Sequence, residues 1–344
     1  MKDRDVLLDV LKGVGIFLVV FGHTCKADVK EMVYWFHMPL FFVLSGCALS
    51  YSSCQTTVGV KKYIKSLVVP YLAFSLITFA YWAMIEWRLR PSKISPIFTG
   101  YLGEMDVRFQ EFLNIFTAYA TRDAFEYNVV LWFLPCLFCS LVAYKWMKLY
   151  LRHWCLAGIV ALPLVYFCLK NSIPLLPWCF EISMVAIPFV WVGDRFYHKA
   201  LSDKRICVVG GAISVLVILL CLSNFHPKIG MLGHKYSEWY VFYPLSLSLI
   251  FLTFCVSKFF VRFDIGVLQW MGRNSLVIMC VHEPIKRIVL KVASVFSGYD
   301  IVSLRMSIIA SVVIVVVTIC IIWPIERAIN HYAPFLVGRT QRNI

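Results

Sequence analysis

The fold is decided by the stretch Asp9-Val10-Leu11-Lys12-Gly13-Val14-Gly15-Ile16-Phe17-Leu18-Val19-Val20-Phe21-Gly22-His23. Most of its residues are apolar, as in a membrane-spanning helix, yet it also carries a carboxylate, an ammonium group and an imidazole. Ionisable groups are costly in hydrocarbon unless they are paired, hydrated or functional. Lys12 and His23 share one helix face, about 16 Å apart along the axis. The stretch therefore predicts a membrane helix with a polar stripe that joins two depths of the bilayer.

The composition as a whole is that of a membrane protein. Of the 344 residues, 60% are hydrophobic and only 15% are charged, and the mean hydropathy is +0.77. Soluble domains do not have this composition, so the sequence predicts an all-α, polytopic integral membrane protein. The net charge of +14 fits basic loops on the cytoplasmic side of a membrane. Nucleic acid is not an expected partner, because no basic stretch is interleaved with accessible aromatic residues.

The expected length of a membrane-spanning helix is about 20 apolar residues, and the chain has ten such runs. Lys and Arg gather in the loops after the second, fourth, sixth and eighth runs and near both termini. This alternation predicts about ten transmembrane helices, an uncleaved first span and two cytoplasmic termini. Lys286, Arg287 and Lys291 fall on the outer side, which an early end of the ninth span and a continuation as an interfacial helix would explain. The predicted spans are residues 7–24, 33–51, 64–86, 129–149, 153–169, 176–194, 206–223, 239–261, 266–285 and 302–325.

One long outer connection, from about residue 87 to 128, interrupts a single membrane-embedded domain that is predicted to cover residues 1–344. Aromatic residues recur in it at intervals of three and four, which predicts an amphipathic helix on the membrane surface. Anchoring is the simpler role for this helix, and contact with a sugar through aromatic and acidic side chains is the alternative. The aromatic residues are Phe109, Phe112, Phe116 and Tyr119, and the acidic ones are Glu104, Asp106 and Glu111.

The thirteen cysteines are scattered, mostly within apolar runs. Cys136 and Cys139 form a C-x-x-C motif inside such a run, where buried thiols that act as small hydrophobic groups are expected. The sequence therefore predicts no metal site, no disulfide framework and no bound cofactor.

Three histidines are predicted to lie in the outer half of the membrane. His23 is at the outer end of the first span, and His37 is about one turn inside the outer start of the second. His282 comes 16 residues into the ninth span, roughly 24 Å from its cytoplasmic end. The three imidazoles are therefore expected to converge, although a lone membrane histidine such as His282 can equally be a hydrogen-bonded packing residue.

The polar stripe suits the transfer of a group across the membrane. Histidine titrates near neutrality and is the usual general base for a hydroxyl group. Lys12 offers a positive charge for a phosphate- or pantetheine-bearing donor, and Asp9, three residues earlier, can pair with it or orient it. The donor would enter from inside and the acceptor would wait outside. Carriers also use such stripes, so these residues alone leave transport open.

Four segments together resemble the acyltransferase-3 family of membrane proteins, which O-acylate sugars of bacterial surface polysaccharides and related acceptors. They follow the family's order over almost the whole chain. Most members have arginine where this chain has Lys12, which keeps the charge but not the bidentate fork and is similar to the fucose 4-O-acetylase-like branch. The segments are Asp9-x-x-Lys12-Gly13 with His23, Phe36-His37-Met38-Pro39-Leu40-Phe41-Phe42-Val43-Leu44-Ser45-Gly46, Leu131-Trp132-Phe133-Leu134, and Gly272-Arg273-Asn274-Ser275-Leu276-Val277-Ile278-Met279 with His282 and Pro284.

The resemblance implies an O-acyltransferase of the bacterial cytoplasmic membrane. It would move an acyl group, expected to be acetyl, from cytoplasmic acetyl-CoA or another acyl-CoA to a sugar hydroxyl of a cell-surface or lipid-linked glycan. His23 would act as the base and His37 would orient or assist it. Lys12 and Asp9 would bind the donor. Trp132, His282 and Ser45 are expected to line the cavity.

Two alternatives remain open at this stage. No serine or cysteine stands in a recognisable nucleophile motif, so direct transfer is preferred to a covalent intermediate, yet Cys25 near His23 keeps that second route open. The rival class is a carrier or flippase for a small anion or a lipid-linked sugar. Such a protein is expected to show inverted repeats and broken helices in matching halves, and neither is visible in the sequence.

Overall fold

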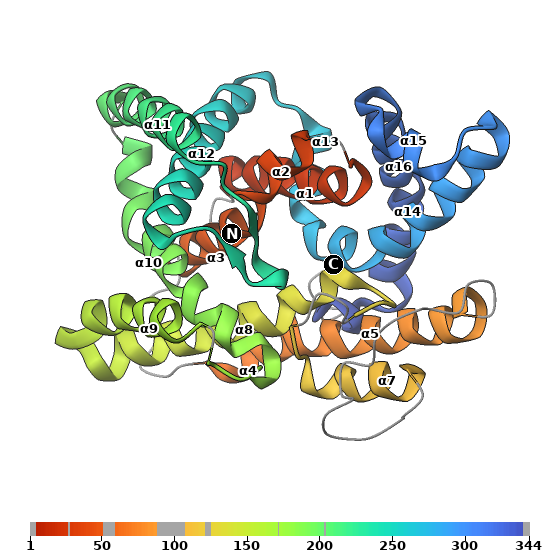
Figure 1. Ribbon diagram of the computed structural model, residues 1–344, viewed down its shortest axis with the longest axis horizontal. Helices are drawn as coiled ribbons and strands as arrows, with labels where there is room; N and C mark the ends of the chain where they lie inside the picture. The colour runs from red at the N-terminus through yellow and green to blue at the C-terminus, as the bar shows by residue number, and fades with distance from the viewer. Residues whose placement is uncertain are drawn as a thin grey trace.

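The computed structural model describes residues 5–26, 28–50, 59–87, 107–120, 125–170, 172–202 and 204–339. These residues form a bundle of helices with one short antiparallel hairpin, β1 (Ile229–Gly230) and β2 (Lys235–Tyr236) (Figure 1). The helices are α1 (Val6–Thr24), α2 (Val29–Tyr34), α3 (His37–Ser50), α4 (Val60–Tyr63), α5 (Val69–Tyr81), α7 (Val107–Thr117), α8 (Phe133–Trp146), α9 (Cys155–Leu169), α10 (Phe180–Ser202), α11 (Lys204–Asn224), α12 (Trp239–Phe260), α13 (Gly266–Arg273), α14 (Ser275–Ser297), α15 (Ile301–Met306) and α16 (Ile308–Tyr332).

Seven helical stretches of the described chain are long and apolar enough to cross a membrane. They confirm a polytopic membrane protein, but they are fewer than the ten spans predicted. α10 and α14 do not qualify, because charged side chains interrupt them, for example Glu181 and Asp194 in α10. The stretches are Val6–Thr24, Val29–Leu49, Val60–Glu86, Val129–Leu169, Arg205–Asn224, Trp239–Phe263 and Ile308–Tyr332.

The stretch Val129–Leu169 contains two predicted spans, 129–149 and 153–169. It consists of α8 and α9, which are joined by a turn around Arg152, a residue with a positive φ of 26°. Gly158 of α9 lies against the Met147 sulfur at the end of α8, so the chain folds back at this turn. Two helices therefore lie here, as the sequence predicts.

The predicted ninth span, residues 266–285, is divided into α13 and α14. Asn274 separates them, and its side-chain amide donates a hydrogen bond to the Trp270 carbonyl at 3.2 Å. The chain remains helical past residue 285, because α14 continues without a break to Ser297, and the interfacial position of this part stays a prediction. Two of its later charged residues, Lys286 and Arg287, contact other helices, as described below, and this gives them partners inside the protein.

Close backbone contacts fix α1 in the bundle. A side chain at Gly13 of α1 would collide with the Leu268 carbonyl of α13, and one at Gly272 of α13 would collide with the Asp9 carbonyl. Small residues allow membrane helices to approach this closely. The glycine after Lys12 in the first motif therefore positions α1 against α13.

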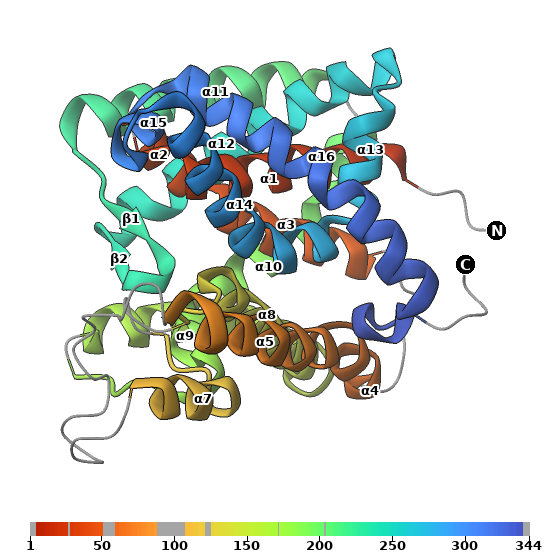
Figure 2. The ribbon, with the colours of Figure 1, turned by 90° about the vertical axis from the view of Figure 1, so that its right-hand side faces the viewer.

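The bundle has two distinct ends (Figure 2). α2, α15 and the β1–β2 hairpin lie at the end where α1 finishes, which we call the His23 end. α4, α13, the start of α1 and the end of α16 lie at the other, which we call the Asp9 end. The first and last described helices thus leave the bundle at the same end, as expected for a chain with both termini on one side of a membrane.

Candidate functional site

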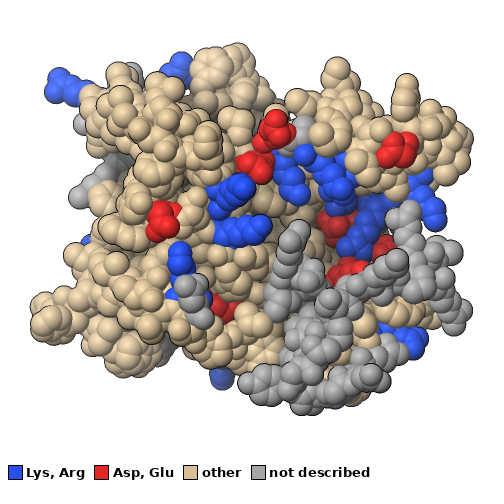
Figure 3. Space-filling view, in the orientation of Figure 1, with Lys and Arg blue, Asp and Glu red and all other residues tan. Residues whose placement is uncertain are grey.

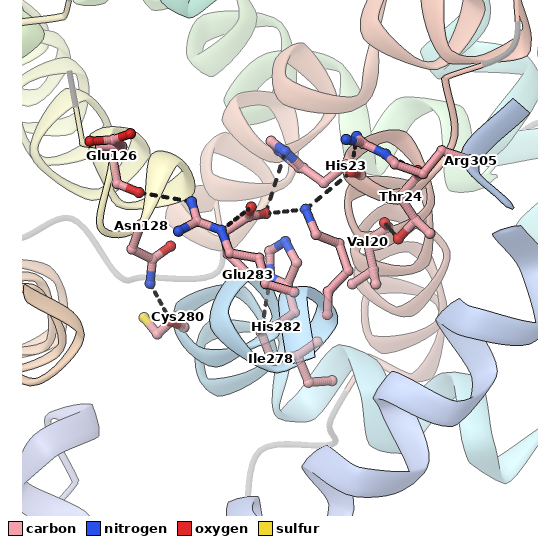
Figure 4. A network of polar contacts seen from close by, with 12 residues as sticks. Val20, His23, Thr24, Glu126, Asn128, Ile278, Cys280, His282, Glu283 and Arg305 are labelled. Carbon is pink, nitrogen blue, oxygen red and sulfur yellow. Dashed lines mark hydrogen bonds and ion pairs between the residues drawn. The ribbon is translucent and has the colours of Figure 1, made fainter. Parts of the chain in front are cut away.

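His23 lies in the last turn of α1, beside a carboxylate from α14 (Figure 4). Its Nδ1 atom is 3.8 Å from Oε2 of Glu283, and the two side chains are only 17% and 6% exposed. The His23 ring is also 5.7 Å from the His282 ring and 6.0 Å from the Tyr34 ring, measured between centroids. An imidazole beside a buried carboxylate has the arrangement of a general base with an orienting group.

The other two predicted histidines lie close by. The His37 ring packs on Tyr34 at 4.8 Å, so that Tyr34 lies between His37 and His23. Nδ1 of His37 donates to the Val33 carbonyl at 2.8 Å, and Nδ1 of His282 donates to the Ile278 carbonyl at 2.9 Å. Because a carbonyl only accepts hydrogen bonds, each ring has its free lone pair on Nε2. Nε2 of His282 is buried and has no hydrogen-bond partner within the described residues.

Sequence reasoning missed the charged partners of this site. Glu283 accepts hydrogen bonds from Lys286 at 2.7 Å and from Arg287 at 3.2 Å. Arg287 also donates to Glu86 of the α5 stretch at 2.8 Å. Lys286 and Glu283 are nearly fully buried, and buried charges need such pairing. The only sequence signal was the presence of basic residues on the wrong side of the predicted topology.

Two cations, Lys286 of α14 and Arg305 of α15, hold the end of α1. Lys286 donates to the His23 carbonyl at 3.1 Å, and Arg305 donates to the His23 and Thr24 carbonyls at 2.9 and 2.8 Å. The last carbonyls of a helix lack intrahelical partners and carry partial negative charge. Lys286 and Arg305 therefore cap α1 and fix the position of the His23 backbone.

A cavity of about 460 Å³ opens beside the site, a volume within the usual range for small-molecule pockets. Glu283, Lys286 and Arg305 line it, and each of them contacts His23. His23 itself is not among the lining residues, so the cavity ends at the side chains that contact the candidate base. Its full lining is Tyr81, Trp82, Glu86, Glu126, Glu283, Lys286, Arg287, Ile288, Leu290, Lys291, Ile301 and Arg305.

The predicted donor-binding residues lie at the Asp9 end. Asp9 is buried and pairs with Arg273 of α13, whose Nε atom is 3.1 Å from its Oδ2. Arg273 in turn donates to Gln269 at 3.1 Å. Lys12 is half-buried one turn further along α1, within electrostatic reach of the Cys47 thiol. A second polar cluster thus lies at the opposite end of α1 from His23.

The three residues predicted to line a cavity, Trp132, His282 and Ser45, are not among the residues that line this one. Trp132 is 4% exposed and packs edge-on against Phe133, with the ring centroids 6.2 Å apart. Ser45 is half-buried in α3. Cys25 and Cys136 are buried free thiols and Cys139 is a partly buried one. The described residues contain no cluster of His, Cys, Asp and Glu that could hold a metal ion.

The predicted outer helix is α7, Val107–Thr117. Phe109 and Phe116 are about half exposed, whereas Phe112 packs against Phe79 of α5 at 5.7 Å between centroids. Tyr119 is half-buried beyond the end of the helix. Glu104 and Asp106 lie outside the described residues. The face of α7 that points into the protein carries Glu111, which is fully buried.

We expect the buried Glu111 side chain to make the stability of the folded protein depend on pH. Burial raises its pKa from 4.5 to about 8, and the Glu126 carboxylate adds to the rise. The folded protein therefore holds a proton that the unfolded chain releases above pH 4.5, so this residue's contribution to stability should fall from pH 4.5 to about 8. Thermal unfolding at pH 5, 6.5 and 8 should show a steeper fall for the wild type than for Glu111→Gln. Equal slopes in the two proteins would contradict a protonated Glu111.

The imidazole of His23, the buried carboxylate of Glu283 and a polar cavity thus lie together at one end of the first helix. The chain belongs to the acyltransferase-3 family, because residues 5–327 match the family described as "Acyltransferase domain". The chain therefore carries an acyltransferase domain within a multi-pass membrane bundle.

One curated relative is nodulation protein NolL of Mesorhizobium japonicum. The two sequences are 28% identical over 110 residues, a match that covers 28% of this chain and 27% of the relative. The chain thus matches little more than a quarter of that protein's length. No solved structure matches this chain significantly.

Proposed function

We propose that this acyltransferase transfers an acetyl group from cytoplasmic acetyl-CoA to a sugar hydroxyl of a cell-surface or lipid-linked glycan. The observation that supports this proposal is His23 beside Glu283, a carboxylate that lines a polar cavity of about 460 Å³. The retained charge at Lys12 supports a place in the fucose 4-O-acetylase-like branch of the family.

In the proposed reaction, Nε2 of His23 takes the proton of the acceptor hydroxyl. The oxygen attacks the thioester carbonyl, the new C–O bond forms, and the C–S bond breaks. The imidazolium then gives the proton to the departing thiolate, so that the ester and the free thiol leave a neutral histidine behind. Glu283 would hold the Nδ1–H tautomer and stabilise the imidazolium between the two steps.

In this proposal the two substrates bind at opposite ends of the bundle. The Asp9 end would face the cytoplasm, with both termini, and the His23 end would face outward in a bacterial cytoplasmic membrane. Lys12 and Asp9 would hold the donor's polar portion while its thioester reaches along α1 to His23. His37 would orient the base through Tyr34, and Trp132, His282 and Ser45 would shape the interior around the reacting groups.

Direct transfer agrees best with the environment of the one cysteine next to the base. Cys25 follows α1 and its side chain is fully buried, so an acyl donor has no open approach to its sulfur. Acyl transfer through a Cys25 thioester would need this thiol to be exposed first.

The test of the proposed function is mass spectrometry of surface glycans from cells with and without the gene. Loss of one acetyl mass per modified sugar in the deletion strain, restored by the wild-type gene, is the expected result. Loss of a different mass would show that the protein transfers the acyl group of that mass instead of acetyl. Unchanged glycans, together with solute movement by the purified protein in vesicles, would favour a carrier instead.

Lys12 gives a prediction for donor binding. Lys12→Ala should remove most activity and raise the KM for acetyl-CoA by about tenfold or more, because the donor's phosphates lose a charged partner. Lys12→Arg should retain a substantial part of the activity. Purified proteins in nanodiscs, normalised to folded protein, provide the comparison. Full activity of the alanine variant would remove Lys12 from the mechanism.

A further inference from the structure

The cavity beside His23 carries cations that its acids do not neutralise. Glu283 is paired with Lys286 and Arg287, and Glu86 is paired with Arg287. These two acids are therefore matched by two cations. Arg305 and Lys291 also line the cavity, and neither forms an ion pair with any described residue.

Arg305 has donor capacity left for a ligand. Its Nε and Nη2 atoms donate to the main-chain carbonyls that end α1, and these neutral acceptors leave the positive charge of the guanidinium uncompensated. The remaining Nη1 group has no hydrogen-bond partner within the described residues. Lys291, two turns before the end of α14, is exposed.

The remaining charges around the cavity do not cancel this excess. Glu126 is the third acid in the lining, but it lies beside Glu111 and forms no ion pair with Arg305 or Lys291 within the described chain. Lys30 adds positive charge within electrostatic reach of Arg305 and of Lys26, and Asp28 and Glu31 lie on the same segment. Lys and Arg side chains gather on this face between α1–α2 and α14–α15 (Figure 3).

We propose that Arg305 and Lys291 form a subsite for an anionic group of the acyl acceptor, a carboxylate or a phosphate. The inference rests on the proposed function and narrows its acceptor to acidic glycans or glycans on a phosphate-linked lipid. Arg305 bonds the His23 backbone, so an anion bound there would hold a neighbouring hydroxyl close to the base. The ring of Tyr81, which also lines the cavity, offers flat apolar surface to a sugar.

The test measures binding separately from transfer. Methyl glucuronide and methyl glucoside are a matched pair that differ in one carboxylate, and methyl glucoside 6-phosphate supplies the phosphate. Binding to the full-length protein in nanodiscs should be about tenfold tighter for an acidic probe than for the neutral one, as expected for one charge-assisted contact. The preference should weaken with added salt. A preference for the carboxylate probe points to an acidic sugar, and one for the phosphate probe points to the lipid-linked phosphate.

Substitutions test whether Lys291 and Arg305 form the subsite. Lys291→Gln and Arg305→Gln should each reduce the preference for the acidic probe several-fold, and Lys291→Arg should restore it. Lys235→Gln, at an exposed lysine of the hairpin at the same end of the bundle, should leave the preference unchanged. Equal binding of acidic and neutral probes, or no binding of either, would overturn the subsite.

Two further outcomes separate this inference from the proposed function. Glycans that lose their acetyl group on deletion, combined with equal binding of the probes, would leave the function standing and remove the subsite. Anion binding without any acyl transfer would support the subsite and contradict the proposed function. A rise in the KM for acetyl-CoA in Lys291→Gln, with unchanged acceptor preference, would assign these cations to the donor and refute the inference.

Discussion

Replacing His23 by alanine should reduce acyl transfer by roughly 10²- to 10⁴-fold, the usual contribution of a general base. The variant should still insert, fold and bind acetyl-CoA, because the contacts that hold this end of α1 use the His23 carbonyl and not its ring. His23→Gln should behave in the same way. The measurement is acyl transfer by purified protein in nanodiscs, normalised to folded protein.

Variants of two other histidines provide comparisons for this experiment. His37→Ala should also lower the rate, by less than His23→Ala, because its ring reaches His23 only through Tyr34. His153 is exposed at the turn between α8 and α9, so His153→Ala should transfer at the wild-type rate. A His23→Ala protein as fast as the wild type would refute the assignment of the base.

Glu283→Gln should lower kcat about 100-fold with little change in the KM for acetyl-CoA, since a misplaced base costs this much even when binding is intact. Glu283 acts here as a positioning residue, because it holds His23 and does not itself exchange protons with substrate. Nitrogen NMR of labelled histidine should show a changed tautomer population at His23. An unchanged NMR signal together with an unchanged kcat would limit Glu283 to a structural role.

Stability must be separated from orientation in that experiment. Removing one partner of a buried ion pair costs about 3–5 kcal/mol, and Glu283→Gln leaves Lys286 buried without its carboxylate. The double variant Glu283→Gln with Lys286→Met removes both charges and should recover much of the lost stability. Its kcat should remain low, because the orienting carboxylate is still missing. Recovery of the rate along with stability would show that Glu283 serves folding alone.

The membrane helices were predictable because hydrophobic length is a local property. α1 and α12 each follow from an apolar run, and their observed bounds are close to those predicted, whereas α16 begins and ends six to seven residues later than the predicted span 302–325. The division between α13 and α14 was not predictable in the same way, since Asn274 lies within a run of suitable length. Its side chain caps α13 and breaks the span without changing the average hydropathy.

The convergence of histidines was predictable from helix depth, whereas their charged partners were not. Depth along a span follows from the rise per residue, and it placed His23, His37 and His282 at one level. Glu283 has no such signal, because its role depends on which side of α14 faces α1. Arg305 falls near the start of the predicted span 302–325, and only packing shows that it binds the end of α1.

The capping of α1 has a consequence for biogenesis. The contacts from Lys286 and Arg305 to the His23 carbonyl join positions 263 and 282 residues apart in the chain. The end of α1 is therefore fixed only after α14 and α15 have been synthesised. A nascent chain that stops before residue 305 has both His23 and Glu283 but lacks one of the two clamps on α1. The end of α1 that carries His23 is thus fixed among the final events of synthesis, and chains that stop before residue 305 lack that contact.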